Sequence, residues 1–290
     1  MLTEKDEGRH HAGPGELWNE SYYFNFYDPE SRIGGFTRMG LQENLNKSNL
    51  WFFLVKDGKQ CYNRLRFDLP YTTAGLEEIT LGDLTYRMLE PLKKFQIGFA
   101  DKETEADLTW EGYHPLLTFG GGKQDLPQHV ASTHYEQYGE VTGTVTLKEM
   151  KYPVHGYGFR DHSWGLRDWE GVQNWKGISG QFGREWGFTA LEMVSLDSRS
   201  ATRHGFIFDG DDNLEVKELD LRVEFEADGT TQKWVEIRLK DEKGRNFRIT
   251  GERIAHCQLP YDRNLIHEAM FRFQMGSQVG YGLFEYNFRT

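Results

Sequence analysis

Hydrophobic and polar residues alternate with a period of two along much of the chain. Residues 219–225 read LDLRVEF and residues 235–239 read VEIRL, so a charged side chain separates each apolar one from the next. A strand with one buried face needs this arrangement, because successive side chains point to opposite faces of a sheet. Comparable alternating or apolar runs occupy residues 21–27, 50–55, 65–69, 95–99 and 140–147.

Turn-forming segments such as KDGK, EADGTT and KDEKGR lie between these runs, as expected where hairpins connect neighbouring strands. No long segment keeps a period of 3.6 residues. The best helical candidate is TLGDLTYRMLEPLKKF at residues 80–95, which Pro91 interrupts because proline lacks the amide hydrogen that a helix interior needs. The pattern therefore predicts an all-β, antiparallel protein.

The number of expected strands exceeds what one small barrel needs. Residues 148–158 (KEMKYPVHGYG) follow one series of strands and precede another, so we place a domain boundary there. The sequence thus predicts two β domains packed together, residues 1–152 and residues 153–290.

Composition narrows the classes of function. Aromatic residues reach 14%, which suits either a heavy β core or a cavity for an apolar ligand. The net charge is −11 and no basic block occurs, so we expect no nucleic-acid partner.

The same reading bears on cell compartment and assembly. No segment approaches 18 consecutive apolar residues and no secretory signal is visible, so we expect a cytoplasmic protein without an integral membrane segment. Cys61 and Cys257 match no ligand spacing; we expect reduced thiols, although one disulfide stays open. A homodimer also stays open.

The densest group of polar and aromatic residues is HGYGFRDHSWGLRDW at residues 155–169. If this segment is extended, Arg160, His162 and Trp164 share one face, while Asp161 and Ser163 share the other. A neutral imidazole can accept a proton from water, and an indole ring can stabilise a cation. The segment is therefore our candidate site, and an inter-domain clamp is the structural alternative.

Protonating a substrate also needs an acid. Glu192 lies between Leu191 and Met193 in an apolar segment, where burial would raise its pKa and keep it protonated. Asp161 is a second candidate for this acid, and a solvent-facing Glu192 on an edge strand is the alternative. We expect Arg160 and four further residues to bind substrate, namely Tyr22, Trp51, His134 and Glu136.

Several polar residues remain outside this candidate site. Glu20 and Tyr135 fit surface or strand-end positions, although each could belong to a site. His10 and His11 are the one histidine pair at close spacing, and they lie in a segment that we expect to be frayed. The sequence therefore predicts no bound metal.

The segment GYGFRDHSWGLRDW, with SYYFNFYDPESRIGGFTRMGLQEN and HYEQYGEVTGTVTL before it, resembles the two-domain lipocalin-like (calycin) family that contains carotenoid hydratases and kievitone hydratase. The resemblance covers most of the chain from Trp18 onward, and RDHSWG is its most specific part. It implies two calycin-type barrels or sandwiches, an apolar pocket and no obligatory cofactor. It also implies that His162 and Trp164 match a His-x-Trp pair used in adding water to an alkene. The family acid is an aspartate, whereas the nearest candidate here is Glu192.

The resulting hypothesis is a cofactor-independent hydratase or dehydratase, or a related isomerase or cyclase. Its substrate would be an alkene or alcohol of an apolar terpenoid, polyketide or phenolic-like molecule. Glu192 or Asp161 would protonate the alkene, Trp164 would stabilise the carbocation, and His162 would position or deprotonate water. A non-catalytic carrier or sensor of an apolar ligand is the alternative, which a lipocalin architecture allows.

Overall fold

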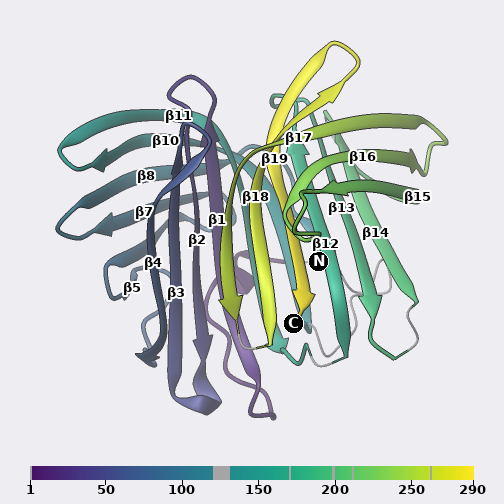
Figure 1. Cartoon of the computed structure of the whole chain (residues 1–290). Helices are drawn as coiled ribbons and strands as arrows, with labels where there is room; N and C mark the ends of the chain where they lie inside the picture. The colour runs from purple at the N-terminus through teal and green to yellow at the C-terminus, as the bar shows by residue number, and fades with distance from the viewer. Residues whose placement is uncertain (1, 120–130, 170, 198–199, 211, 262) are drawn as a thin grey trace. The chain divides into compact units, whose positions relative to one another are not determined.

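A computed structural model describes residues 2–119, 131–169, 171–197, 200–210, 212–261 and 263–290. Apart from two short 3-10 turns, Glu4–Glu7 (η1) and Glu43–Leu45 (η2), its regular elements are antiparallel strands (Figure 1). These strands form two compact units, so the predicted all-β fold with two barrel-like domains is confirmed.

The first unit is an 11-stranded sheet in the order β4-β3-β2-β1-β11-β10-β8-β7-β6-β5, with β9 paired to β10. The first long strand of the chain, β1, therefore lies beside β11, more than a hundred residues later. The strands are β1 (Trp18–Asp28), β2 (Ile33–Gln42), β3 (Lys47–Lys56), β4 (Lys59–Pro70), β5 (Ile79–Leu81), β6 (Leu84–Glu90), β7 (Lys94–Ala100), β8 (Thr104–Gly112), β9 (Leu117–Phe119), β10 (Thr133–Leu147) and β11 (Met150–Leu166).

The inward face of this sheet is a core of aromatic and aliphatic side chains. Tyr22, Phe24 and Phe26 contribute alternate positions of β1 to this core. Phe52 and Phe99 stack with ring centroids 4.0 Å apart. Burial alternates along β7 and β8, as expected for half-buried strands, whereas β1, β2 and β3 are buried at nearly every position.

The best helical candidate of the sequence, residues 80–95, is not a helix, in agreement with the all-β prediction. This segment contains the end of β5, all of β6 and the start of β7. Leu84 and Tyr86 are fully buried, and β6 pairs along its length with β7. Alternating burial and ladder hydrogen bonds outweigh the helical propensity of the leucines here, as tertiary context often does.

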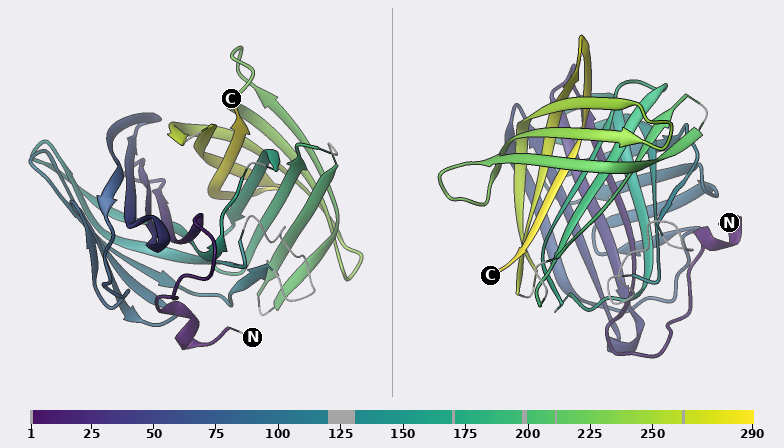
Figure 2. Two further views of the ribbon diagram at one scale, coloured as in Figure 1. Left: turned by 90° about the horizontal axis from the view of Figure 1, so that it is seen from below. Right: turned by 90° about the vertical axis from the view of Figure 1, so that its right-hand side faces the viewer.

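The second unit is a closed barrel in which neighbouring strands follow chain order (Figure 2). Pairing of β12 with β19 closes it, and its core includes Phe188, Phe271 and Phe273. Its strands are β12 (Val172–Gln181), β13 (Trp186–Ser195), β14 (Ala201–Asp209), β15 (Asp212–Phe225), β16 (Gln232–Asp241), β17 (Asn246–Tyr261), β18 (Asn264–Met275) and β19 (Gln278–Arg289).

The division between the units differs from the predicted boundary at residue 152. The chain passes from the first unit to the second between Asp168 and Trp169, and the turn Asp57–Gln60 is grouped with the second unit. Residue 152 instead lies inside β11, which pairs with β1 and β10 of the first unit. The segment expected to separate two series of strands thus lies largely within this one long strand.

Two further expectations concern single features. Cys61 and Cys257 are free thiols, as expected. Within the described part of the chain, none of the helical segments is long and apolar enough to cross a membrane.

Candidate functional site

Strand pairing brings the candidate residues of β11 together with β1 and β10. His162 is directly opposite Tyr22 on β1 and Tyr135 on β10. Arg160 is opposite Phe24, and Trp164 is opposite Glu20. Directly paired residues share a face of the sheet, so these side chains belong to the inward face that carries the core.

Gly165, the residue after Trp164, allows β11 to pass close to the backbone of Ser132. Gly165 has a φ of +128°, a conformation that residues with a Cβ rarely adopt. A Cβ at this position would lie 2.4 Å from the backbone nitrogen of Ser132, whose amide donates to the carbonyl of Trp164. The glycine after Trp164 is therefore required where β11 approaches the segment before β10.

The N-terminal turn supplies a buried carboxylate to the site. Glu7 is fully buried and accepts two hydrogen bonds of 2.9 Å from the Arg160 guanidinium. The amide of Leu92 and the hydroxyl of Tyr135 also donate to it, each at 2.8 Å. Burial alone would raise the pKa of Glu7, but the charge and hydrogen bonds of Arg160 hold it below its ordinary value. Glu7 is therefore an ionised partner of Arg160.

The rest of the N-terminal segment is also attached to the first unit. Arg9 donates to the carbonyls of Thr72 and Ala74, and the amide of Ala12 donates to the Glu43 carboxylate. Asn44 donates to two further carbonyls of the segment, those of Gly13 and Gly15. These contacts fix the segment that carries Glu7 and His10, so the expectation of a frayed terminus around His10 is wrong.

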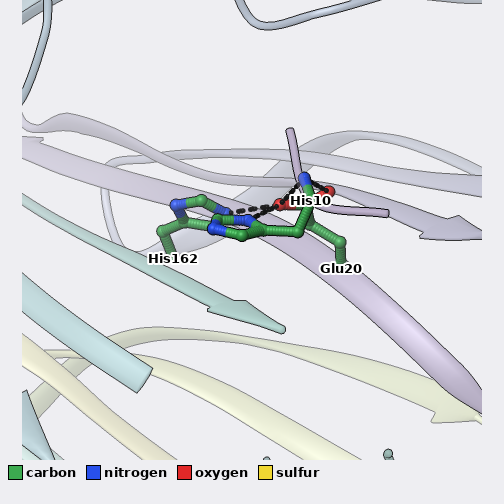
Figure 3. Close-up of side chains that lie close together, drawn as sticks. All are labelled: His10, Glu20 and His162. Atoms are coloured by element: carbon green, nitrogen blue, oxygen red, sulfur yellow. Dashed lines mark hydrogen bonds and ion pairs between the residues drawn. The ribbon is translucent and has the colours of Figure 1, made fainter. Parts of the chain in front are cut away.

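A second carboxylate, Glu20, joins two histidines (Figure 3). Its Oε1 lies 2.8 Å from Nδ1 of His10 and 3.0 Å from Nε2 of His162, and the backbone amide of His10 also donates to it. Burial would raise the pKa of Glu20, but the hydrogen bonds from His10 and His162 lower it to about 2. Glu20 is therefore ionised although it is fully buried.

His162 connects the two carboxylates. Its Nε2 faces Glu20, and its Nδ1 lies 2.9 Å from the hydroxyl of Tyr135, which donates to Glu7. Burial lowers the pKa of His162, and the nearby carboxylates do not fully offset this effect. The neutral imidazole is thus the favoured form near neutral pH.

The chain of contacts from Glu20 through His162 and Tyr135 to Glu7 has room for one more proton. The three contacts are Glu20 to His162, His162 to Tyr135, and Tyr135 to Glu7, and each needs one proton to be a hydrogen bond. When both carboxylates are ionised and His162 is neutral, the imidazole supplies one proton and the tyrosine hydroxyl supplies another, which makes two. One contact therefore lacks a proton, and a protonated His162 would complete all three. Such a network can take up one proton and release it again.

His10 and Trp164 form the accessible edge of this network. Their rings stack with centroids 3.7 Å apart and an interplanar angle of 11°, and the centroid of Trp164 lies 4.8 Å from that of His162. The side chain of His10 is 22% exposed, whereas those of His162 and Glu20 are inaccessible. A ligand approaching from solvent therefore meets His10 and Trp164 first.

His10, Glu20 and His162 also resemble a metal-binding group. Their potential ligand atoms lie within 4.8 Å of one another, and two imidazoles with one carboxylate can bind zinc or iron. However, the distances of 2.8 and 3.0 Å to Glu20 are those of direct hydrogen bonds. A metal ion could enter only by replacing these bonds.

Comparison with known proteins adds a family and a fold. A model of a domain of unknown function (DUF7064) matches residues 3–290. The chain belongs to this family. No curated protein sequence matches it.

Solved structures share the architecture of this DUF7064 protein. Kievitone hydratase from Nectria haematococca superimposes with a TM-score of 0.70 at 15% identity, covering 96% of this chain and 91% of that one. CghA with Sch210972 gives a TM-score of 0.66 at 10% identity, covering 95% and 89%. The predicted resemblance to the two-domain kievitone hydratase fold is thereby confirmed. At these identities the likeness concerns the fold alone.

In this DUF7064 protein, some of the predicted site residues lie together and others lie on the opposite face of the sheet. Arg160, His162 and Trp164 lie together, with Tyr22 beside them. The remaining candidates of the first unit follow a different ladder, in which Trp51 pairs with Arg38, Arg38 with Tyr23, Tyr23 with Asp161, and Asp161 with Glu136. Asp161, Trp51 and Glu136 therefore lie on the opposite face of the sheet from His162.

Residues on that opposite face have their own partners. The Arg38 guanidinium lies over the Trp51 ring, 4.5 Å from its centroid. Nε2 of His134 is 3.0 Å from the Glu136 carboxylate. Burial would lower the pKa of His134, but Glu136 raises it above its ordinary value. His134 and Glu136 thus form a hydrogen-bonded pair apart from the network around His162.

Glu192 differs from the expected protonated acid. It belongs to the second unit and accepts hydrogen bonds of 2.8 Å from both Lys176 and Arg203. Burial would raise its pKa, but these two cations lower it below the ordinary value. The expectation that Glu192 stays protonated is therefore wrong, because its apolar sequence neighbours did not reveal the two cations on adjacent strands.

Sequence reasoning missed four members of the network, namely Glu7, His10, Glu20 and Tyr135. The surface or strand-end interpretation of Glu20 and Tyr135 is wrong, since both are fully buried. For Glu20 a signal was available, because it shares the period-two face of Tyr22 and Phe24. Glu7 offers no such signal, because it precedes the first strand and meets Arg160 only in the folded protein.

Proposed function

We propose that this protein is a cofactor-independent hydratase or dehydratase that acts on an apolar terpenoid, polyketide or phenolic-like molecule. The observation that supports this function best is the buried network from Glu20 to Glu7, which has one more contact than it has protons. Adding water to an alkene needs one group that gives a proton and then takes one back, and this network has that capacity.

The proposed reaction balances around His162. The protonated network gives one proton to an alkene carbon, which leaves a cation on the neighbouring carbon. Water forms a bond to that cation, and its surplus proton returns to the network. Dehydration is the same sequence in reverse, and isomerisation or cyclisation would follow from the same cation.

Trp164 would stabilise the cation. Its ring lies beside His162 and at the accessible edge of the site, and an indole face attracts positive charge. Arg160 would act indirectly by holding Glu7 ionised. We assign the acid–base role to His162 with Glu20 and Glu7, in place of Glu192 and Asp161, because Glu192 is paired with two cations and Asp161 lies on the other face.

The fold supports this proposal. Kievitone hydratase is named for a hydration, and CghA has been crystallised with a small molecule, Sch210972. Both share the two-unit architecture at low identity, so substrate and reaction direction must come from experiment.

The test uses water labelled with heavy oxygen. Wild-type protein is incubated in this water with a panel of apolar alkenes, including linear terpenes and prenylated phenols, and the products are analysed by mass spectrometry. We expect a product that carries the heavy oxygen. The variant His162→Gln should lower its rate about 10²–10⁴-fold, the usual contribution of a general acid–base group.

A matched control comes from the same strand. His155 is exposed on β11, so His155→Gln should keep the wild-type rate. If every alkene of the panel is recovered from the protein unchanged, with no heavy oxygen and no isomerisation, the result would contradict the proposal and favour a carrier.

A further inference from the structure

The two tyrosines that contact His162 differ in their hydrogen bonds. Tyr135 donates to Glu7 and lies within hydrogen-bond distance of Nδ1 of His162. Tyr22 stacks on the His162 ring with centroids 4.3 Å apart. Its hydroxyl is buried and has no hydrogen-bond partner among the residues that the structure describes.

The charged groups of the buried network each have several partners. Glu7 accepts from Arg160, Tyr135 and Leu92, while Glu20 accepts from His10 and His162. Arg160 also donates from Nε to Gln137. The hydroxyl of Tyr22 differs from these groups, because it has no partner among the residues that the structure describes.

Charge keeps the Tyr22 hydroxyl protonated. Burial raises its pKa well above the ordinary value, and the nearby charges of Glu20 and Glu7 add to this effect. The Glu20 carboxylate lies close enough to the hydroxyl to raise its pKa through charge and a weak hydrogen-bond-like contact, but the two groups do not meet the geometry of a direct hydrogen bond. A buried donor of this kind is costly unless an oxygen from water or a ligand occupies the position beside it.

We propose that the Tyr22 hydroxyl binds the reacting oxygen of the substrate. This inference rests on the proposed hydration or dehydration. The oxygen is that of water in hydration, and the same atom is the alcohol oxygen in dehydration. Tyr22 donates to one lone pair of this oxygen and keeps its own proton throughout. In hydration, the other lone pair forms the bond to carbon. In dehydration, the electron pair of that bond returns to the oxygen as water leaves. In both directions the protons pass to and from His162.

The variant Tyr22→Phe tests this assignment, with Tyr135→Phe as its matched control. Both changes remove one hydroxyl and keep a buried ring. We expect Tyr22→Phe to melt at or above the wild-type temperature, because the hydroxyl that it removes has no partner in the protein. Tyr135→Phe should melt several degrees lower, since Glu7 and His162 lose a partner. Equal losses in both variants would overturn the proposal.

Crystal structures of the substrate-free proteins provide a test that does not depend on turnover. Wild-type protein should contain an ordered water oxygen within hydrogen-bond distance of the Tyr22 hydroxyl, and Tyr22→Phe should lack it. A direct hydrogen bond from Tyr22 to Glu20 with no such oxygen would overturn the proposal. The same water in both proteins would also overturn it.

Turnover then tells the two possible failures apart. If wild-type protein hydrates or dehydrates a member of the panel, Tyr22→Phe should lower the rate about tenfold or more, as loss of a preorganised donor does. An unchanged rate would overturn the role of Tyr22 alone. If an ordered oxygen is bound to Tyr22 but no substrate is turned over, the result would contradict the proposed function. The proposal that Tyr22 binds an oxygen atom would still hold.

Discussion

Each unit of the molecule places carboxylates beside cations, but the two arrangements have different chemical capacities. In the second unit, Glu192 lies between Lys176 and Arg203, and the side chain of Arg203 is 47% exposed. In the first, Glu7 and Arg160 are buried, and a histidine links Glu7 to Glu20 through Tyr135.

The difference lies in which partner can change its charge. Lysine and arginine remain protonated near neutral pH, so the group around Glu192 has no proton to exchange. A histidine between two carboxylates can titrate in the range where enzymes work. Under the proposed function, the histidine connected to the buried ion pair, and not the ion pair alone, gives the first unit its capacity for acid–base chemistry.

The largest expected effect comes from removing the buried cation. The variant Arg160→Met leaves Glu7 buried without its counter-charge, which should cost about 3–5 kcal/mol of unfolding free energy. Arg203→Met, which removes a half-exposed partner of Glu192, should cost less than about 1 kcal/mol. Urea denaturation of the two variants measures both values. Similar losses would show that burial does not separate the two regions.

A second effect should appear in acid. The pKa of Glu20 is lowered from 4.5 to about 2, so its ionised form stabilises the folded state above pH ~5, and this contribution is lost as the pH falls toward 2. The shift corresponds to about 3 kcal/mol. Denaturation at a series of pH values should show a shallower acid decline for Glu20→Gln than for wild-type protein. Parallel curves would mean that Glu20 is not held ionised by its histidines.

The smallest expected effect concerns metals. Because Glu20 already accepts from His10 and His162 directly, a chelator should change neither the melting temperature nor the turnover of the purified protein. Calorimetric titration with Zn²⁺ should show no tight binding at this group. If the purified protein contained a stoichiometric metal, and if removing it abolished activity, His10, Glu20 and His162 would have to be interpreted as a metal centre and not as a hydrogen-bonded network.

Much of the fold could be predicted because period-two alternation reports directly on burial. It identified β1, β3, β7, β15 and β16 from local sequence. It did not locate β6 within residues 80–95, where leucines fit both periods and only the pairing of β6 with β7 decides. The predicted boundary at residue 152 differs from the division between the units because the segment between the two expected series of strands is itself a strand, β11, of the first sheet.

The candidate site was partly predictable for the same reason. The face shared by Arg160, His162 and Trp164 follows from strand geometry within one segment. Glu20 could have been added from its position in β1. Glu7 and His10 could not, because their roles depend on how the N-terminal segment meets strands far along the chain, and the same limit concealed the cations beside Glu192.

The Glu7–Arg160 pair joins residues 153 positions apart, and this separation sets an order of assembly. On a ribosome, Glu7 is made long before Arg160, so it stays hydrated while β1 to β10 are synthesised. Closing so long a loop early would be entropically unfavourable. The contact between Glu7 and Arg160 is therefore expected to form late in folding, after the strands between these two residues have paired.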